Sequence, residues 1–232
     1  KNGKESFGLY NMGIMTSTGD TIEMANAREQ WGIYNNSTHD SEVQDIIIKS
    51  HNSTEYDYGI SNKSGNLIVN SGSITMYDSA ESKGIYSNTD TANTTSINVD
   101  YNIYNSTNSF GGYIKEGTLT IESGTMNVKG TTNAYGVYIE TTGTLTLGVF
   151  DGNGTDAADM KENDPLIEAI APSAIGVTMN NGSFHYYDGK IIGSTIPRPV
   201  GDITTSTETN YQVITKTDEV TGYNYCILEF IK

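Results

Sequence analysis

The residues best suited to bind a metal ion are oxygen-bearing side chains in an acidic segment of the chain. At positions 1, 3, 5, 9 and 12 of a possible Ca²⁺ loop stand Asp151, Asn153, Thr155, Asp159 and Glu162. Carboxylate and amide oxygens at such intervals suit calcium, but position 6 holds Asp156 where an EF-hand turn requires Gly. No flanking helices are evident either. We therefore expect a solvated loop and no cofactor, with Ca²⁺ left open as the alternative.

The three histidines and the single cysteine give little support for catalysis. His39 and His51 fall in polar segments that we expect to be loops. His185 and Asp188 could form a site, but a solvated strand residue is the simpler expectation for His185. No His and Cys cluster has metal-ligand spacing. Cys226 is expected to be a small buried residue of a strand, and one cysteine cannot form an internal disulfide.

The elements that carry these residues follow from an internal repeat. A block of an aromatic residue, Gly, an aliphatic residue and then a polar or aromatic residue recurs at intervals of 24 to 27 residues, with one last interval of 40. Its glycines are Gly8, Gly32, Gly59, Gly84, Gly111, Gly136 and Gly176, of which Gly111 belongs to a weaker copy. Three copies also share two later glycines, so each unit contains three short strands. Such a unit cannot bury its own apolar face, whereas stacked units bury a continuous core.

The repeat predicts an all-β fold, a single-stranded parallel β-helix (solenoid) of about seven coils. Right-handedness is the default for parallel connections. We expect the coils to occupy residues 1–195, with a loop insertion at 149–172 that replaces a strand and contains at most a helical turn. Residues 196–232 lose the repeat and are expected to form a C-terminal β-hairpin-like cap, because an open solenoid end exposes unpaired strand edges.

Alternation within the first strand of each coil predicts one inward and one outward column. The inward residues are Leu9, Ile33, Ile60, Ile85, Val137 and Val177. The matching outward residues are Tyr10, Tyr34, Tyr86, Tyr113 and Tyr138, with Ser61 and Thr178 in the other two coils. These tyrosines are the candidate ligand-binding residues. We expect them to offer flat ring faces to sugars, beside hydrogen bonds from Asn11, Asn35 and Asn62. Alternatively, the rings only stabilise one another, by about 0.2–1 kcal/mol per pair.

Composition limits the classes of partner. A net charge of −15, with Arg28 and Arg198 as the only arginines, disfavours nucleic acid and anionic membrane surfaces. No apolar run is long enough for a transmembrane segment.

A hydrophobic content of 35% raises the alternative of disorder, but the apolar residues recur at fixed places, as a core requires. The start at Lys1, inside a repeat, is expected of a segment of a longer protein.

Residues 117–124 (GTLTIESG), 143–148 (GTLTLG) and 183–189 (SFHYYDG) resemble the repeats of large Gram-positive bacterial surface proteins with pectate-lyase-like β-helices. The resemblance covers about residues 7–195 and marks architecture better than activity. It implies an extracellular, cell-surface location and adhesion to host glycans or host surface proteins. No functional residue carries over with it.

Three function classes follow. The first is an adhesive or structural solenoid, binding a host partner or serving as a stalk. The second is a polysaccharide lyase or hydrolase, which needs paired carboxylates, or acidic Ca²⁺ ligands near a base, where this sequence mostly places Tyr, Thr, Asn and Ser. The third is ice binding, for which Thr118, Thr120, Thr144 and Thr146 give a discontinuous threonine array. We expect the first, and no enzymatic activity.

Overall fold

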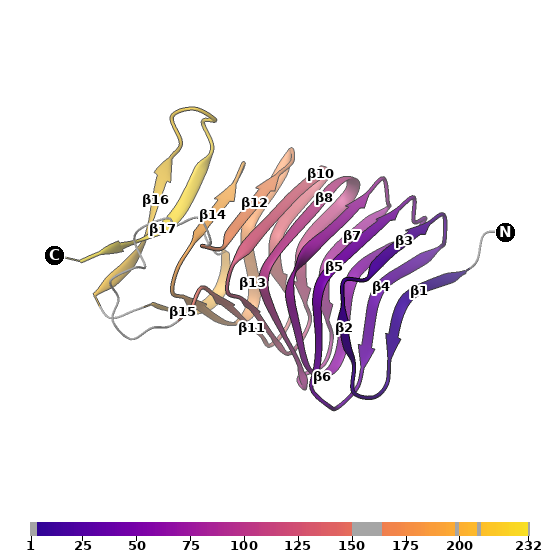
Figure 1. Cartoon of the computed structure of the whole chain (residues 1–232). Helices are drawn as coiled ribbons and strands as arrows, with labels where there is room; N and C mark the ends of the chain where they lie inside the picture. The colour runs from indigo at the N-terminus through magenta and orange to yellow at the C-terminus, as the bar shows by residue number, and fades with distance from the viewer. Residues whose placement is uncertain (1–3, 150–163, 198–199, 208–209, 232) are drawn as a thin grey trace.

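The computed structural model describes residues 4–149, 164–197, 200–207 and 210–231, and in this part of the chain it contains seventeen strands and no helix. The strands stack along one axis, with the two ends of the chain at opposite ends of the stack (Figure 1). They are β1 (Glu5–Asn11), β2 (Thr16–Thr18), β3 (Thr21–Ala25), β4 (Glu29–Asn36), β5 (Ser41–His51), β6 (Tyr56–Tyr77), β7 (Glu81–Ser87), β8 (Ala92–Ile114), β9 (Thr118–Ile121), β10 (Gly124–Ile139), β11 (Gly143–Leu147), β12 (Leu166–Ile170), β13 (Ser173–Tyr186), β14 (Lys190–Gly193), β15 (Val200–Thr207), β16 (Tyr211–Thr217) and β17 (Asn224–Phe230).

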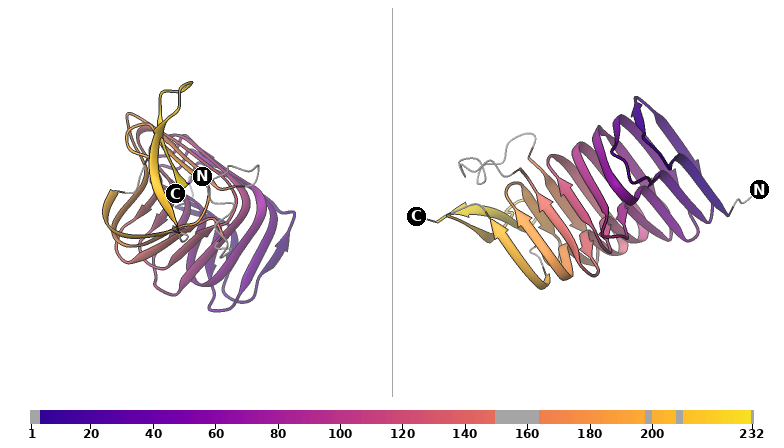
Figure 2. Two further views of the ribbon diagram at one scale, coloured as in Figure 1. Left: turned by 90° about the vertical axis from the view of Figure 1, so that its left-hand side faces the viewer. Right: turned by 90° about the horizontal axis from the view of Figure 1, so that it is seen from below.

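Parallel pairing organises these strands into three faces of a solenoid. The first face begins with β1 and β4, which pair through Leu9 and Ile33. The second face includes β9 and β11, which pair through Leu119 and Leu145. The third face begins with β3 and the second half of β5. Strand β6 passes through all three faces and therefore makes one complete coil. The stacked coils form a solenoid of about seven turns, as predicted. Figure 2 shows this stack from two further sides. The handedness of the coil stays a prediction.

The core is a set of registered columns inside the solenoid. Leu67, Leu119 and Phe184 lie in one internal column, linked through Thr94 and Leu145, and all three are fully buried. The predicted inward residues Ile33, Ile60, Ile85, Val137 and Val177 are fully buried on the first face, and Leu9 of the first coil is partly buried against the core. Stacking thus gives each strand the apolar cover that no single coil supplies.

The repeated glycine is required by close stacking of the coils. A Cβ atom on Gly32 would lie 2.5 Å from the carbonyl oxygen of Gly59, and one on Gly59 would lie 2.7 Å from that of Gly84. No larger residue fits at such a distance. The glycines therefore form a column of their own, and this explains their spacing of one coil.

Left-handed backbone conformations turn the corner between the third and first faces. Asn26, Asn52, Asp78 and Asn105 have φ values of 60°, 57°, 56° and 59° and lie in consecutive coils. Asn and Asp adopt this conformation more readily than other residues with a Cβ. The side chains also connect the coils, because the amide nitrogen of Asn52 donates to the amide oxygen of Asn26 at 3.3 Å.

Two expectations about the chain beyond residue 148 need correction. Within the predicted insertion, residues 166–170 are not a loop but strand β12, which pairs in parallel with β10 and β14. Ile167 and Ala169 point into the core, so a period-two pattern stands where the Ala and Glu content suggested a loop or helical turn. Beyond residue 195, β15 still pairs in parallel with β13, so solenoid pairing continues to Thr207.

The C-terminal hairpin is confirmed. Strands β16 and β17 pair antiparallel from Tyr211 and Phe230 to Thr217 and Asn224. Strand β17 also pairs antiparallel with β14 of the last coil, with Cys226 opposite Ile191. Cys226 is fully buried, as expected of a small strand residue. The hairpin thus covers the free edge of β14.

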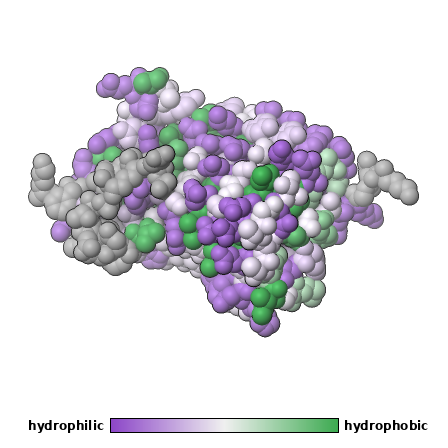
Figure 3. All heavy atoms as spheres, in the orientation of Figure 1, coloured by the Kyte–Doolittle hydropathy of each residue, from purple (hydrophilic) through white to green (hydrophobic). Residues whose placement is uncertain are grey.

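The outer surface is largely hydrophilic on the side drawn in Figure 3, where hydrophobic residues form small scattered areas. In the described residues, no helix could cross a lipid bilayer.

Candidate functional site

Two columns of side chains run side by side along the first face. The first column contains Phe7, Trp31, Tyr58, Lys83, Phe110 and Tyr135. The second column contains Tyr10, Tyr34, Ser61, Tyr86, Tyr113, Tyr138 and Thr178. We call the rings of both columns the aromatic ridge. It brings together all five tyrosines predicted from the sequence, and adds the five rings of the first column, which were not predicted as site residues.

Both columns face outward because the in–out alternation is interrupted at the repeated glycine: a Cβ atom on Gly32 would meet the buried side chain of Ile48. The residue after Gly32, Ile33, points inward, so Trp31 and Tyr34 flank an inward pair instead of alternating with it. Their rings meet edge to face at 6.2 Å, with an angle of 89° between the planes. The same contact joins Phe7 to Tyr10 at 5.3 Å and 86°. The repeated sequence block already contained the first column, but strict alternation did not predict two successive inward positions at the glycine and the residue after it.

Within each column the rings stack face to face along the solenoid axis. Phe7 and Trp31 are 4.6 Å apart with planes within 6°, and Tyr10 and Tyr34 are 5.0 Å apart, also within 6°. Ring contacts of this length follow from the spacing of neighbouring parallel strands, which is about 4.8 Å. Trp31 is consequently only 9% exposed, whereas Tyr10 in the first coil is 54% exposed.

The expectation of flat, accessible ring faces is therefore wrong for the stacked part of the ridge. The stacked rings cover each other's faces and leave their edges toward solvent. The later tyrosines are less regular: Tyr86 and Tyr113 are tilted by 51°, and Tyr113 and Tyr138 by 36°. The hydroxyl of Tyr138 lies at the surface, where its oxygen accepts a hydrogen bond from the amide of Asn180 at 3.1 Å.

A lysine replaces the aromatic ring in the middle of the first column. Lys83 is 6% exposed, and its Nζ lies 4.7 Å from the ring centre of Tyr113, 4.8 Å from Tyr56 and 5.2 Å from Tyr58. Its ammonium group forms an ion pair with Glu81. Burial lowers the pKa of Lys83, while the Glu81 carboxylate opposes that shift. The ring faces and the carboxylate together compensate for the loss of water around the cation.

A second lysine covers the ridge near the position where the second column lacks a ring. Ser61 is fully buried there, and Tyr58 contacts Tyr86 across the gap with ring centres 5.1 Å apart. The Nζ of Lys63 lies 4.5 Å from the ring centre of Tyr86. Burial, assisted by the charges of Lys83 and Lys115, lowers the pKa of Lys63 to about 8. The centre of the ridge is thus cationic and aromatic in an otherwise acidic protein.

The asparagines expected to assist ligand binding lie inside the solenoid instead. Asn11 donates to the amide oxygen of Asn35 at 2.7 Å, and Asn35 donates to that of Asn62 at 2.9 Å. Asn35 and Asn62 are fully buried, and Asn11 is 8% exposed. One step along the strand from an outward tyrosine is an inward position, so these amides form a structural ladder and do not reach a ligand on the ridge.

The other candidate residues lie apart from the aromatic ridge or outside the described part of the chain. The possible calcium ligands from Asp151 to Glu162 lie outside the described residues. His39 lies in a loop as expected, but His51 is the last residue of β5 and not part of a polar loop. His185 stacks on Tyr187 with ring centres 6.0 Å apart. The described part of the chain contains no group of three or more His, Cys, Asp or Glu side chains arranged for a metal ion.

Among the described residues, one carboxyl group with a clearly raised pKa faces the interior. Asp57 is fully buried on the first face, where it accepts hydrogen bonds from the hydroxyls of Ser50 at 2.6 Å and Ser79 at 3.2 Å. Burial raises its pKa to about 6, against the lowering effect of these two hydrogen bonds. An acid with such a pKa suits proton transfer, but a group inside the solenoid cannot reach a polysaccharide.

Comparisons of this chain with protein-family models, with curated proteins and with solved structures gave no match. The functional argument therefore rests on the geometry of the faces described above.

Proposed function

We propose that this chain is an extracellular segment of a bacterial surface protein that acts as a structural and adhesive solenoid without catalytic activity. Host glycans or host surface proteins are the proposed partners, and the chain would be one part of a longer surface protein. The observation that carries the proposal is the aromatic ridge, which extends over β1, β4, β6, β7, β8 and β10 on one side of the solenoid.

The ridge suits contact with a partner because its ring edges and hydroxyls form a rigid, amphipathic surface. Tyrosine gives a large contact area at a small cost in conformational entropy. Tyr34, Tyr86, Tyr113 and Tyr138 are partly exposed, and neighbouring rings fix their positions. Mixed apolar and hydroxyl groups on such a surface can pack against sugar rings and hydrogen-bond their hydroxyls.

Stacking favours the stalk as the second function. Ring pairs on adjacent strands stabilise a sheet by about 0.2–1 kcal/mol each, and the ridge would therefore stiffen the solenoid without any ligand. A polysaccharide-degrading enzyme is the less favoured alternative, since the perturbed carboxyl of Asp57 is buried in the core.

The test replaces two adjacent ridge tyrosines, Tyr86→Ser with Tyr113→Ser. Binding to a glycan array and to host cells is measured beside the thermal midpoint of unfolding. The matched control, Tyr86→Phe with Tyr113→Phe, keeps the rings and removes only the hydroxyls. If the ridge is adhesive, the double serine variant should lose binding, while its free energy of unfolding should fall by only about 1–3 kcal/mol. A lowered midpoint, with no binding by any of the three proteins, would assign the ridge to the stalk alone.

A further inference from the structure

The third face carries a shorter ring stack that differs from the aromatic ridge. His51, Tyr77 and Tyr104 occupy one outward column on β5, β6 and β8. The rings of His51 and Tyr77 are 4.7 Å apart and within 12° of parallel, and those of Tyr77 and Tyr104 are 5.2 Å apart and within 4°. The corner at Asn52, Asp78 and Asn105 separates this stack from the ridge.

The stack ends after three rings, because its column holds no ring in the coil on either side. Next to His51 the column has Ala25, and next to Tyr104 it has Lys129. Lys129 is exposed. The inner faces of the three rings cover each other, so the outer faces of His51 and Tyr104 are the ones left for another molecule. Each of these two rings lines a depression in the surface.

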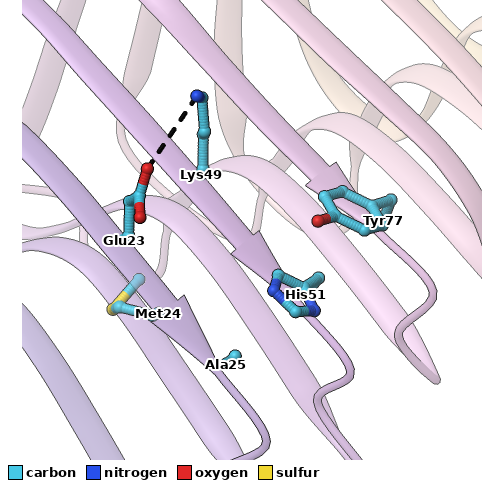
Figure 4. A pocket seen from close by; sticks show the side chains of 6 residues that line it. All are labelled: Glu23, Met24, Ala25, Lys49, His51 and Tyr77. Carbon is cyan, nitrogen blue, oxygen red and sulfur yellow. Dashed lines mark ion pairs between the residues drawn. The ribbon is translucent and has the colours of Figure 1, made fainter.

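At the His51 end the depression measures about 240 Å³ and is lined by Glu23, Lys49 and Ala25 as well as the ring (Figure 4). Glu23 and Lys49 form an exposed ion pair of 3.9 Å there. The charged pair makes this end less suited to an uncharged ligand.

At the Tyr104 end the depression is larger, about 590 Å³, and its lining is mostly uncharged and polar. The side chains around the ring come from Thr75, Asn102, Asn105, Asn127 and Lys129. Asn127 donates to the amide oxygen of Asn102 at 3.3 Å, so the two amides lie side by side on adjacent strands. A flat ring face next to amide and hydroxyl groups is the combination that recognises a sugar: C–H groups pack on the ring, and hydroxyls meet donors and acceptors.

We propose that the Tyr104 depression binds a pyranose ring of a glycan, which lies on the free face of Tyr104 as the next layer of the stack. The amides of Asn127, in the same layer as the sugar, and of Asn102, in the layer of Tyr104, hydrogen-bond the sugar hydroxyls. This site is separate from the aromatic ridge and does not depend on ligand binding there.

The test closes the free face instead of deleting the ring, since removal of Tyr104 would only expose the face of Tyr77. In Lys129→Tyr a new ring continues the column, as Tyr104 continues it from Tyr77. The control, Lys129→Ser, removes the same charge and leaves the face open. Cellohexaose, xylohexaose, mannohexaose and chitohexaose serve as probes in isothermal titration calorimetry with the whole chain.

We expect the parent chain to bind at least one of these oligosaccharides and Lys129→Tyr to bind it at least about tenfold more weakly, at an unchanged or higher thermal midpoint. Lys129→Ser and the ridge pair Tyr86→Ser with Tyr113→Ser should keep binding within about threefold of the parent. Binding by the parent to none of the four probes would overturn the proposal. Oligosaccharide binding that survives unchanged in Lys129→Tyr would also overturn it. If binding is lost in Tyr86→Ser with Tyr113→Ser instead, the sugar binds to the aromatic ridge and the proposal is wrong.

Discussion

At the scale of single residues, Lys83 is the side chain least expected from its surroundings. It occupies a position where the coils on both sides have a ring, and it forms an ion pair with Glu81. The sequence shows it as an exception within an aromatic column, and a charged residue on an outward face would ordinarily be solvated. The structure instead buries it among Tyr56, Tyr58 and Tyr113.

Replacing Lys83 tests whether this cation stabilises the ridge. Lys83→Met should lower the free energy of unfolding by about 1–3 kcal/mol, because the ring contacts are lost and Glu81 is left without its cation. Lys83→Phe with Glu81→Gln should return to the stability of the parent or exceed it, since a ring then fills the column. Urea denaturation measures both. Parent-like stability of Lys83→Met would show that the cation contributes nothing.

Asp57 predicts a dependence of stability on pH. Its pKa is raised from 3.8 to about 6 in the folded chain, so folding favours the protonated acid. The resulting stabilisation is fully present below pH 3.8 and is lost as the pH rises through about 6; the shift corresponds to about 3 kcal/mol. Asp57→Asn should remove this component. The unfolding free energy of the variant minus that of the parent should therefore become more positive from pH 4 to pH 7, because only the parent loses stability over this range. A difference that stays constant over this range would contradict the assignment.

At the scale of elements, the glycine spacing was enough to predict the three strands of each coil and the inward columns. Alternation placed Ile33, Ile60 and Ile85 correctly, because the inward positions of a strand are mostly apolar where coils stack on a common core. It did not predict the ring orientations of the ridge. Those depend on contacts between coils, which no single repeat contains.

Two further misses also have physical reasons. In β12, Glu168 and Ala169 weaken the strand signal, since both residues are depleted in strands, although Ile167 and Ala169 keep the inward alternation. His51 follows a polar residue and precedes Asn52, so it resembles the start of a loop. The strand in fact extends to His51, where its ring stacks on Tyr77.

Leu119 in β9 tests the internal column. It is fully buried between Thr94 and Leu145 of the neighbouring coils. Leu119→Ala should lower the free energy of unfolding by about 2–5 kcal/mol, because it leaves a cavity with coils on both sides. Thr120→Ala, at the adjacent outward position, should change it by less than about 0.5 kcal/mol. Equal small effects of both substitutions would mean that the faces of β9 are assigned incorrectly.

At the scale of the whole molecule, both proposed surfaces depend on the same register of the coils. The ridge and the His51–Tyr104 stack exist only because each coil places its equivalent residue beside that of the next. A slip of one residue would turn every outward ring into the core. The same register includes β12, which pairs with β10 on the third face.

The most direct test of this account is a distance between spin labels on one column of the third face. Glu23 and Glu168 are joined in register through Lys49, Thr75, Asn102 and Asn127, although they are far apart in the sequence. With both glutamates replaced by cysteine and Cys226 by alanine, pulsed electron paramagnetic resonance should give a narrow distribution near roughly 24 Å, five strand spacings. A broad distribution, or one centred beyond about 35 Å, would contradict the stacked register on which both surfaces depend.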